Sequence, residues 1–515
     1  MKIEELKTDK ALSVIISFSL FVILAHLYTN IFAGYGIFRD EYYYMACSKR
    51  PAMGYVDHPP FSIYILMIIR FLFGESMFAI RLLPALASGV MVFMTGSLVR
   101  KMGGGMYAVI ISFAAITGAP LLWGMFSNYS MNFYEYIVWL AAAHIVIRLS
   151  DKREPKLWAG LGIILGMGLL NKISVLWLGA GVFFALLLTP LRSVFKTRCP
   201  YGAAVIALLL FLPFIIWNFT HDFAHLEFMR NASGVKYSGI TRMDFITGFL
   251  LDLSPLTLFI WLPGLLFFFF NKEGKKFMPL GIMFLTAFFI LLLNGHSKSE
   301  YLGSAFPLLF AGGGVMLEKL FLTRRIVIIK YALPVLVFIT GLMLAPFGMP
   351  VLPEETFINY SRAIGVQRSN SESKELSELP QFYADMHGWE EMSRTVSRVY
   401  MSLPESERKS TAVFANNYGE AASIEYYRKK YPLPKVLCGH NSYWFWSKDS
   451  LGGVKTIIIT GGNPEDHRES CTEVTEAARV VSRYAMPYEN QLPVYVCRKF
   501  KRPLLDIWDR VRFYI

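Results

Sequence analysis

Residues 34–60 read GYGIFRDEYYYMACSKRPAMGYVDHPP and lie between two hydrophobic stretches of an apolar chain. Beside six aromatic side chains, this segment holds Arg39, Asp40, Glu41, Asp57 and His58. Ionisable groups at a membrane boundary are costly to place, so their concentration indicates a functional site. The loop therefore predicts where the chemistry of a membrane protein is located.

The composition excludes an ordinary soluble protein. The chain has 515 residues, of which 54% are hydrophobic, 42 are Phe and only 17% are charged. Several apolar runs approach the ~20 residues that cross ~30 Å of hydrocarbon as a helix. The composition therefore predicts a polytopic α-helical membrane protein with about eleven crossings, the first over residues 11–33 as an uncleaved anchor and the last over 326–346.

The lysines and arginines lie in short connectors between the apolar runs. The formal net charge of +13 can indicate nucleic-acid binding, but these residues form no single basic face. Scattered basic connectors are typical of cytoplasmic loops. With the amino end inside, four loops face outward, at 34–60, 124–132, 218–243 and 294–300. We therefore expect a multi-pass protein of the plasma (inner) membrane, in contact with lipids and without a nucleic-acid partner.

The segment FSIYILMIIRFLFG (61–74) is short for a crossing and contains Arg70. We interpret it as a juxtamembrane or tilted helix. If it crossed fully, the later connectors would change sides and the basic ones would lie outside, against the positive-inside rule.

The composition changes near residue 351. A polar, acidic stretch over 351–380 predicts a linker that separates a transmembrane domain, 1–350, from a further domain, 381–515. In that further domain, helical patterns alternate with short apolar runs such as TAVFANN and VKTIIIT. This alternation predicts a small α/β domain, and crossing parity places it outside the cytoplasm.

The polar C-terminal region contains Cys438, Cys471 and Cys497. If this region is periplasmic, one disulfide among the three is allowed, and the third thiol stays free unless it reaches Cys47. Three unlinked cysteines are the equally open alternative.

Asp40 and Glu41 are adjacent carboxylates in the first loop. On a helix they point in different directions, so one can face a cavity while the other pairs locally. A carboxylate partly desolvated by aromatics is a suitable general base for a hydroxyl group. An ordinary solvated pair is the alternative.

Asp57 and His58 precede Pro59 and Pro60. The prolines allow a helix to begin just after them, and its free N–H groups can bind an anion. Asp57 can bind a hard cation, while His58 can contact a phosphate oxygen or the same metal. The alternative is a capped helix start with a solvated histidine.

The other expected outward positions also contain ionisable or polar groups. They are Asn132, Glu135, Lys172, His221, His225, Lys298, Glu300 and Tyr301. Singly, each is more often an interfacial residue than a ligand. Because they share one face, they predict a cavity at the level of the membrane surface.

Carboxylates and cations in one such cavity suit a polyprenyl-phosphate sugar as donor. A carboxylate removes the acceptor proton, the acceptor attacks the anomeric carbon, and polyprenyl phosphate leaves as an anion. Lys, His, Arg or a divalent metal can neutralise that anion, whereas no nucleotide or redox cofactor is needed.

Six motifs, in chain order, resemble the family 39 (PMT-like) glycosyltransferases of the GT-C fold. They are RDEYYY, GYVDHPPFSIYIL, FAIRLLPAL, GLLNK, WNFTHDFAHLEF and HSKSEYLGSAFPLL, within roughly the first two-thirds of the chain. The family includes protein O-mannosyltransferases and lipid A aminoarabinose transferases. The resemblance implies an inverting glycosyltransferase that transfers a sugar to a hydroxyl or phosphate of an extracytoplasmic lipid, glycan or protein.

The resemblance also implies roles for single residues. Asp40, with Glu41 beside it, matches the family's acidic base. Asp57 matches the acid that in aminoarabinose transferases helps to hold a metal, and His221 or His225 would supply the histidine. His58 stands where those enzymes have lysine.

The resemblance implies that residues of the motif HSKSEYLGSAFPLL, in the last outward loop, contact the donor phosphate. Lys298 and Tyr301 resemble the residues that contact it, and Arg81 in FAIRLLPAL and Lys172 in GLLNK join this expected set with His58. Glu135 is the acid nearest to the family's second-loop aspartate.

Two other classes of function remain open at this stage. A transporter or flippase of lipid-linked sugars would need a polar path at the midplane and usually broken helices in repeated halves. A non-catalytic envelope-assembly protein would need no carboxylate in the first loop.

Overall fold

The computed structural model describes residues 10–152, 154–323, 327–366 and 375–515, so residues 367–374 of the expected linker lie outside the described residues. The chain divides into two compact units. Unit 1 consists of Met1–Ala33, Phe73–Ile216 and Gly239–Leu352. Unit 2 consists of Gly34–Leu72, Trp217–Ser238 and Pro353–Ile515. Two segments expected in the transmembrane domain thus belong with the C-terminal residues.

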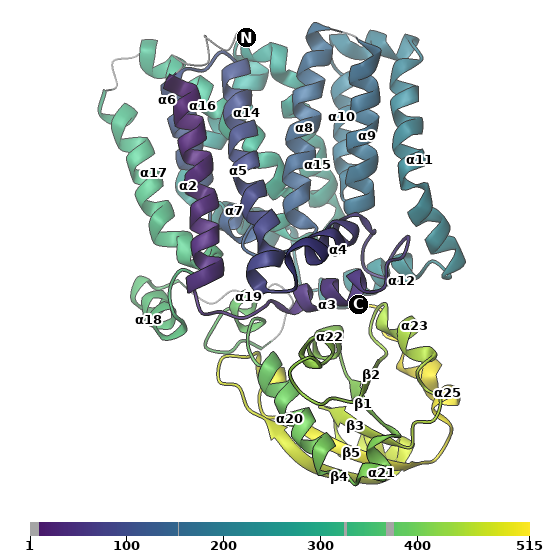
Figure 1. Cartoon of the computed structure of the whole chain (residues 1–515). Helices are drawn as coiled ribbons and strands as arrows, with labels where there is room; N and C mark the ends of the chain where they lie inside the picture. Colours follow the sequence, from purple (N-terminus) through teal and green to yellow (C-terminus); the bar gives the residue numbers. More distant parts are fainter. Residues whose placement is uncertain (1–9, 153, 324–326, 367–374) are drawn as a thin grey trace. The chain divides into compact units, whose positions relative to one another are not determined.

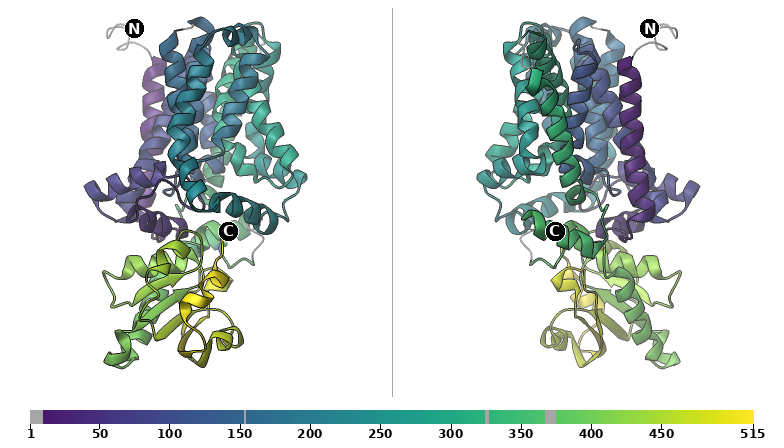
Figure 2. Two further views of the ribbon diagram at one scale, coloured as in Figure 1. Left: turned by 90° about the vertical axis from the view of Figure 1, so that its right-hand side faces the viewer. Right: turned by 90° about the vertical axis from the view of Figure 1, so that its left-hand side faces the viewer.

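Unit 1 is a bundle of apolar helices that lie side by side (Figures 1 and 2). Its α-helices are α2 (Lys10–Phe32), α5 (Met77–Lys101), α6 (Met106–Thr117), α7 (Pro120–Met125), α8 (Asn132–Asp151), α9 (Pro155–Asn171), α10 (Val175–Leu187), α11 (Cys199–Thr220, continuing into unit 2), α13 (Arg242–Asp252), α14 (Leu258–Phe270), α15 (Met278–Asn294), α16 (Phe306–Thr323) and α17 (Val327–Gly348). Its 3-10 helices are η1 (Pro190–Lys196), η3 (Pro255–Thr257), η4 (Gly274–Phe277) and η5 (Ser299–Ala305).

Seven helices of the described residues are long and apolar enough to cross a membrane, or up to nine if each of two bent pairs is one span. The bends are 101° between α10 and η1, and 87° where α13 gives way to η3 and α14. In each bent pair the second helix, η1 or η3, begins at a proline, and α7 also begins at a proline after α6 ends. The residue before a proline disfavours the helical conformation, so a helix tends to end there. The multi-pass helical fold is confirmed, and the number of eleven crossings stays a prediction.

Glycines let the helices of unit 1 approach closely. A Cβ on Gly264 of α14 would collide with the carbonyl of Leu309 on α16, and one on Gly313 would collide with the carbonyl of Ile260. Small residues at such contacts are typical of helix packing in membranes, where close van der Waals contact drives association.

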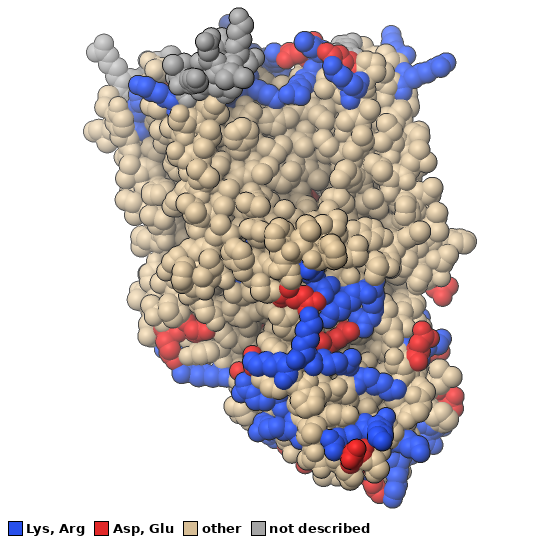
Figure 3. Space-filling model, in the orientation of Figure 1, with Lys and Arg blue, Asp and Glu red and all other residues tan. Residues whose placement is uncertain are grey.

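Several Lys and Arg side chains of unit 1 lie together at one end of its bundle. Figure 3 shows a broad uncharged surface over the helices and Lys and Arg side chains at the end where α5 finishes with Arg100 and Lys101. Arg148 lies in the last turn of α8, at the same end. These connectors are those that the sequence assigns to the cytoplasm.

Unit 2 contains a five-stranded mixed sheet of order β2-β1-β3-β5-β4. Its strands are β1 (Thr411–Ala415), β2 (Lys435–Cys438), β3 (Thr456–Thr460), β4 (Cys471–Val480) and β5 (Leu492–Phe500). β1 pairs in parallel with β2 and β3, while β5 is antiparallel to β3 and β4. The expected small α/β fold is confirmed, with β1 and β3 at the two apolar runs.

Helices of unit 2 come from three parts of the chain. They are α3 (Arg39–Ser48), α4 (Phe61–Phe73, whose last residue belongs to unit 1), α12 (Ala224–Asn231), α18 (Glu354–Ile364), α19 (Gln381–Ala384), α20 (Trp389–Ser402), α21 (Glu405–Arg408), α22 (Tyr418–Tyr427), α23 (Tyr443–Lys448), α24 (Pro464–Ser470) and α25 (Leu504–Ile507), with the π-helix η2 (Ala232–Lys236) and the 3-10 helices η6 (Pro487–Glu489) and η7 (Trp508–Val511). α20 and α22 pack on each other and on the sheet, and α22 also contacts α3. At 13 residues, α4 is about 20 Å long, too short to cross a bilayer.

The cysteines of unit 2 resolve the alternatives that the sequence left open. Cys471 and Cys497 form a disulfide that links β4 to β5. Cys438 and Cys47 are free and buried. Cys438, the third cysteine of the C-terminal region, therefore does not form a disulfide with Cys47.

One carboxylate of unit 1 stabilises a helix that belongs to a different segment. Glu318 on α16 accepts hydrogen bonds from the backbone N–H of Gly105 at 2.6 Å and of Ala108 at 3.1 Å, at the first turn of α6. These N–H groups have no partner within their own helix, so Glu318 acts as a cap from outside and complements the helix dipole.

We predict that Glu318→Ala lowers the free energy of unfolding by about 1–2 kcal/mol, the usual effect of losing a cap. Thermal unfolding of the detergent-purified protein measures the change. Glu273→Ala is the matched control, because Glu273 pairs with Lys319 but is largely exposed, and such pairs contribute little. Equal losses in the two variants would contradict the capping role.

Candidate active site

Helix α3 separates the two adjacent carboxylates of the first loop. Glu41 is 1% exposed, and its carboxylate accepts a hydrogen bond from the backbone N–H of Phe38 at 2.8 Å. The Asp40 side chain is 30% exposed. Glu41 therefore stabilises the start of α3, and Asp40 is the carboxylate that keeps access to solvent.

Asp40 is held at one oxygen only. Its Oδ1 accepts a hydrogen bond from the Tyr418 hydroxyl at 2.8 Å and from Arg39 Nε at 3.3 Å. Its Oδ2 has no hydrogen-bond partner among the residues that the structure describes. A carboxylate fixed at Oδ1 and open at Oδ2 can accept a proton without having to break an existing contact.

Asp57 lies in the same unit and is bound by Tyr43. The Tyr43 hydroxyl donates to Asp57 Oδ1 at 2.9 Å and accepts from the backbone N–H of Ser442 at 3.3 Å. Burial raises the pKa of the Asp57 carboxyl above its ordinary value, while nearby His58 and the hydrogen bond from Tyr43 oppose that shift.

His58 is fully buried, at 0% exposure. Its ring centroid lies 5.0 Å from that of Tyr55 and 5.3 Å from that of Tyr44, and its Nδ1 lies 2.9 Å from the carbonyl oxygen of Pro59. Its Nε2 lies 3.9 Å from Asp57 Oδ2. Because His58 Nε2 is buried without a hydrogen-bond partner among the described residues, its expected contact with a donor phosphate stays a prediction.

The described residues do not bring the expected metal ligands together as a group, so the metal stays a prediction. His225 Nδ1 lies 2.9 Å from the carbonyl of Val56, and burial lowers the pKa of His225 to about 4. His221 stacks on Trp217, with ring centroids 4.2 Å apart. Within the described ranges, no three His, Cys, Asp or Glu side chains form a group that could hold a metal ion. The metal therefore has no part in the chemistry derived below.

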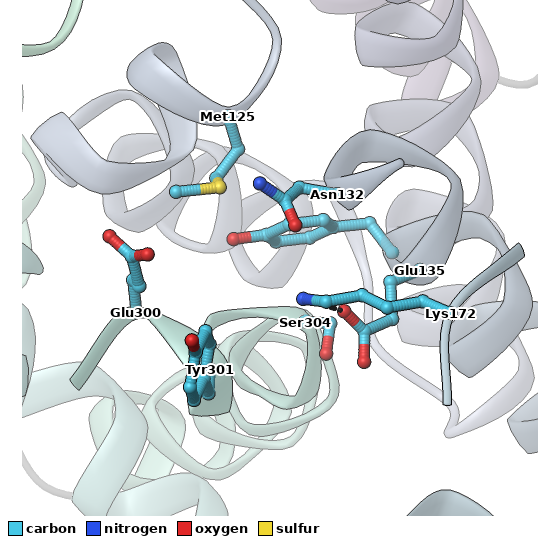
Figure 4. A pocket seen from close by; sticks show the side chains of 8 residues that line it. Met125, Asn132, Glu135, Lys172, Glu300, Tyr301 and Ser304 are labelled. Atoms are coloured by element: carbon cyan, nitrogen blue, oxygen red, sulfur yellow. Dashed lines mark hydrogen bonds and ion pairs between the residues drawn. The ribbon is translucent and has the colours of Figure 1, made fainter. Parts of the chain in front are cut away.

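Unit 1 contains a small polar pocket that is partly open to solvent. Its lining consists of Met125, Asn132, Glu135, Tyr136, Lys172, Glu300, Tyr301 and Ser304. These residues come from the end of α7, the start of α8, the connector between α9 and α10, and η5 (Figure 4). Five of them are residues that the sequence assigned to the site.

An ion pair organises this pocket. Lys172 Nζ lies 3.1 Å from Glu135 Oε2, and Ser174 donates to Glu135 Oε1 at 2.6 Å. The ammonium group also lies 5.0 Å from the centre of the Tyr301 ring. Figure 4 shows the Lys172 and Glu135 side chains meeting at one wall, with Tyr301 and Ser304 on η5. Lys172 is thus a cation with a fixed position.

Two hydroxyl groups of the pocket have no hydrogen-bond partner among the residues that the structure describes. The Tyr136 hydroxyl and Ser304 Oγ are buried without a hydrogen bond, although both residues line the pocket. Buried hydroxyls are usually satisfied, so these two can bond water or a polar ligand in the pocket.

The remaining residues assigned from sequence lie elsewhere in unit 1. Lys298 Nζ is 3.7 Å from Glu300 Oε1, so it neighbours the pocket through that lining residue. Arg81 is buried on α5, at 2% exposure, and does not line the pocket.

Sequence reasoning missed Tyr43, Tyr136, Ser304, Tyr418 and Ser442. Tyr43 and Tyr136 each lie within a stretch that was singled out, but nothing distinguished them from neighbouring aromatics. Tyr418 and Asp40 are 378 residues apart, and no local pattern predicts their contact.

Part of the chain matches a family model. Residues 57–217 match the model described as dolichyl-phosphate-mannose-protein mannosyltransferase. Over 202 residues the chain is 27% identical to undecaprenyl phosphate-alpha-4-amino-4-deoxy-L-arabinose arabinosyl transferase 1 of Pseudomonas fluorescens (strain Pf0-1). That match spans 35% of this chain and 34% of the relative, about a third of its length.

The fold likeness extends much further than the sequence likeness. The crystal structure of ArnT from Cupriavidus metallidurans bound to undecaprenyl phosphate superimposes with a TM-score of 0.61 at 11% identity, covering 94% of this chain and 97% of that one. The apo form of that protein gives a TM-score of 0.59 at 10% identity with the same coverage. The resemblance predicted from the motifs is therefore confirmed: the chain is similar to the PMT-like glycosyltransferases and has their GT-C fold.

Proposed function

We propose that the protein is an inverting glycosyltransferase. It transfers a sugar from a polyprenyl-phosphate donor to a hydroxyl or phosphate of an extracytoplasmic lipid, glycan or protein. The observation that carries this proposal is the state of Asp40, whose Oδ1 is held by Tyr418 and Arg39 while its Oδ2 is open. A general base needs this combination of fixed geometry and access.

The reaction is a single displacement. Asp40 takes the proton of the acceptor, the acceptor oxygen forms a bond to the anomeric carbon, and the bond from that carbon to the phosphate oxygen breaks. One displacement inverts the anomeric centre. Polyprenyl phosphate leaves with the electron pair and needs no proton, so one carboxylate is sufficient.

The pocket of unit 1 is assigned to the donor. Lys172 supplies a positive charge whose position is fixed by Glu135, and such preorganised charge stabilises a leaving phosphate. Lys298 adds a second cation next to Glu300. The unsatisfied hydroxyls of Tyr136 and Ser304 suit a polyhydroxylated sugar. The undecaprenyl phosphate bound to the ArnT structure supports a donor of this chemical class.

The proposal includes an orientation. The basic end of unit 1 faces the cytoplasm under the positive-inside rule, and unit 2 faces outward. A disulfide between Cys471 and Cys497 agrees with an oxidising compartment.

We predict that Asp40→Asn abolishes transfer, with a loss of about 10²-fold or more, because the amide cannot accept the proton. The variant and the wild type are expressed in a deletion strain, and mass spectrometry measures glycosylated acceptors and lipid-linked sugars. The lipid-linked sugar should accumulate while binding of undecaprenyl phosphate to the purified protein stays unchanged. Normal glycosylation by Asp40→Asn would remove Asp40 as the base, and absence of transfer by the purified wild-type protein would then favour a transporter or a scaffold.

We further predict that Lys172→Gln weakens binding of undecaprenyl phosphate about tenfold or more, as expected for the loss of a charge-assisted hydrogen bond. Native mass spectrometry of the detergent-purified protein, titrated with undecaprenyl phosphate, measures the change. Lys276→Gln is the control, because Lys276 pairs with Asp151 at 2.8 Å and lies outside the pocket. A folded Lys172→Gln variant with wild-type affinity would remove Lys172 from the donor site.

A further inference from the structure

The start of α22 contacts the proposed base directly. Tyr418 is the first residue of α22, and its hydroxyl donates to Asp40 Oδ1 at 2.8 Å. The two residues lie on different helices of unit 2 that pack on each other. The C-terminal part of the chain therefore supplies a hydrogen bond to a carboxylate of the first loop.

The Tyr418 side chain is itself rigidly placed. It is buried, and its ring centroid lies 4.8 Å from that of Tyr43 and 4.8 Å from that of His440. Asn417, just before it, caps α22 by accepting a hydrogen bond from the backbone N–H of Glu420 at 3.0 Å. A hydroxyl held by packing and by a capped helix can impose its geometry on a partner.

Arg39 reaches the same oxygen of Asp40 and depends on the same helix. Its guanidinium lies 5.5 Å from the centre of the Tyr418 ring and 3.4 Å from Asp385 Oδ2. Its stem lies against Gly419, where an added Cβ would stand only 2.5 Å from Arg39 Cγ. The glycine thus gives Arg39 the space that it needs to reach Asp40.

We propose that Tyr418 is a positioning residue for Asp40. By binding Oδ1 together with Arg39, Tyr418 fixes the rotation of the carboxylate and leaves Oδ2 for the acceptor proton. This inference rests on the proposed glycosyltransferase function and assigns the α22 segment a part in it. The first loop then supplies the base and one of the two groups that orient it, Arg39, while α22 supplies the other.

The test compares two tyrosines of α22 that both bond to α3. Tyr427 lies on α22, and its hydroxyl lies 3.1 Å from that of Tyr42 on α3, so Tyr427→Phe removes a similar bond without touching Asp40. Full-length protein is assayed with lipid-linked sugars extracted from a deletion strain as donor and membranes of that strain as acceptor. Turnover at several donor concentrations separates kcat from KM.

We expect Tyr418→Phe to lower kcat about 10- to 100-fold with the donor KM within about twofold, the effect of a misplaced catalytic group. Tyr427→Phe should stay within about twofold of wild type in both constants. Gly419→Ala, which displaces Arg39, should lower kcat in the same direction, with a thermal unfolding curve to show that it is folded.

The possible outcomes distinguish failure of the positioning role of Tyr418 from failure of the proposed glycosyltransferase function. If Asp40→Asn is inactive but Tyr418→Phe turns over like wild type, the positioning role of Tyr418 is wrong and the proposed glycosyltransferase function is retained. Equal losses in Tyr418→Phe and Tyr427→Phe would show that the contact of α22 with α3 is merely structural, which overturns the inference. If Asp40→Asn is fully active, Asp40 is not the base and the positioning role falls with it, whereas a wild-type protein without turnover would overturn the proposed function itself.

Discussion

The structure depends on charged side chains that are paired across distant segments of the chain. Arg50 binds both oxygens of Glu425, 375 residues away, at 3.1 and 2.6 Å. Burial alone would raise the pKa of Glu425, yet the hydrogen bonds and charge of Arg50 hold that pKa below its ordinary value. Because breaking one half of such a pair leaves an uncompensated buried charge, these pairs help to fix which segments pack together. α3 is joined in this way to α22.

The fold could be predicted from sequence wherever a single segment contains the whole signal. Apolar runs of bilayer length predicted the helices of unit 1, and the β-branched or apolar runs at β1 and β3 predicted part of the sheet. β4 has mostly exposed residues and is paired through β5, so its own sequence carried little hydrophobic signal. The helix breaks at Pro120, Pro190 and Pro255 show that the length of an apolar run does not by itself fix where a regular helix begins and ends.

The site could be predicted only in part, for the same reason. The loop charges that gather in the pocket, such as Glu135 and Lys172, were visible because ionisable residues beside apolar runs are rare. The metal site stays a prediction, because residue type does not fix ring orientation: His225 Nδ1 lies at the Val56 carbonyl and His221 stacks on Trp217. The contact of Tyr418 with Asp40 arises from tertiary packing, which no local pattern reports.

Comparison of three carboxylates shows what sets Asp40 apart. Glu41 is 1% exposed and bonded to the backbone, and the Asp57 side chain is 14% exposed and bound by Tyr43. Asp40 is 30% exposed and held at one oxygen. A base has to be both fixed and reachable, and burial satisfies the first need at the expense of the second. At 11% identity, the fold shared with ArnT constrains backbone paths more than side chains, so the choice of Asp40 as the proposed base rests on its exposure and on its contacts with Tyr418 and Arg39.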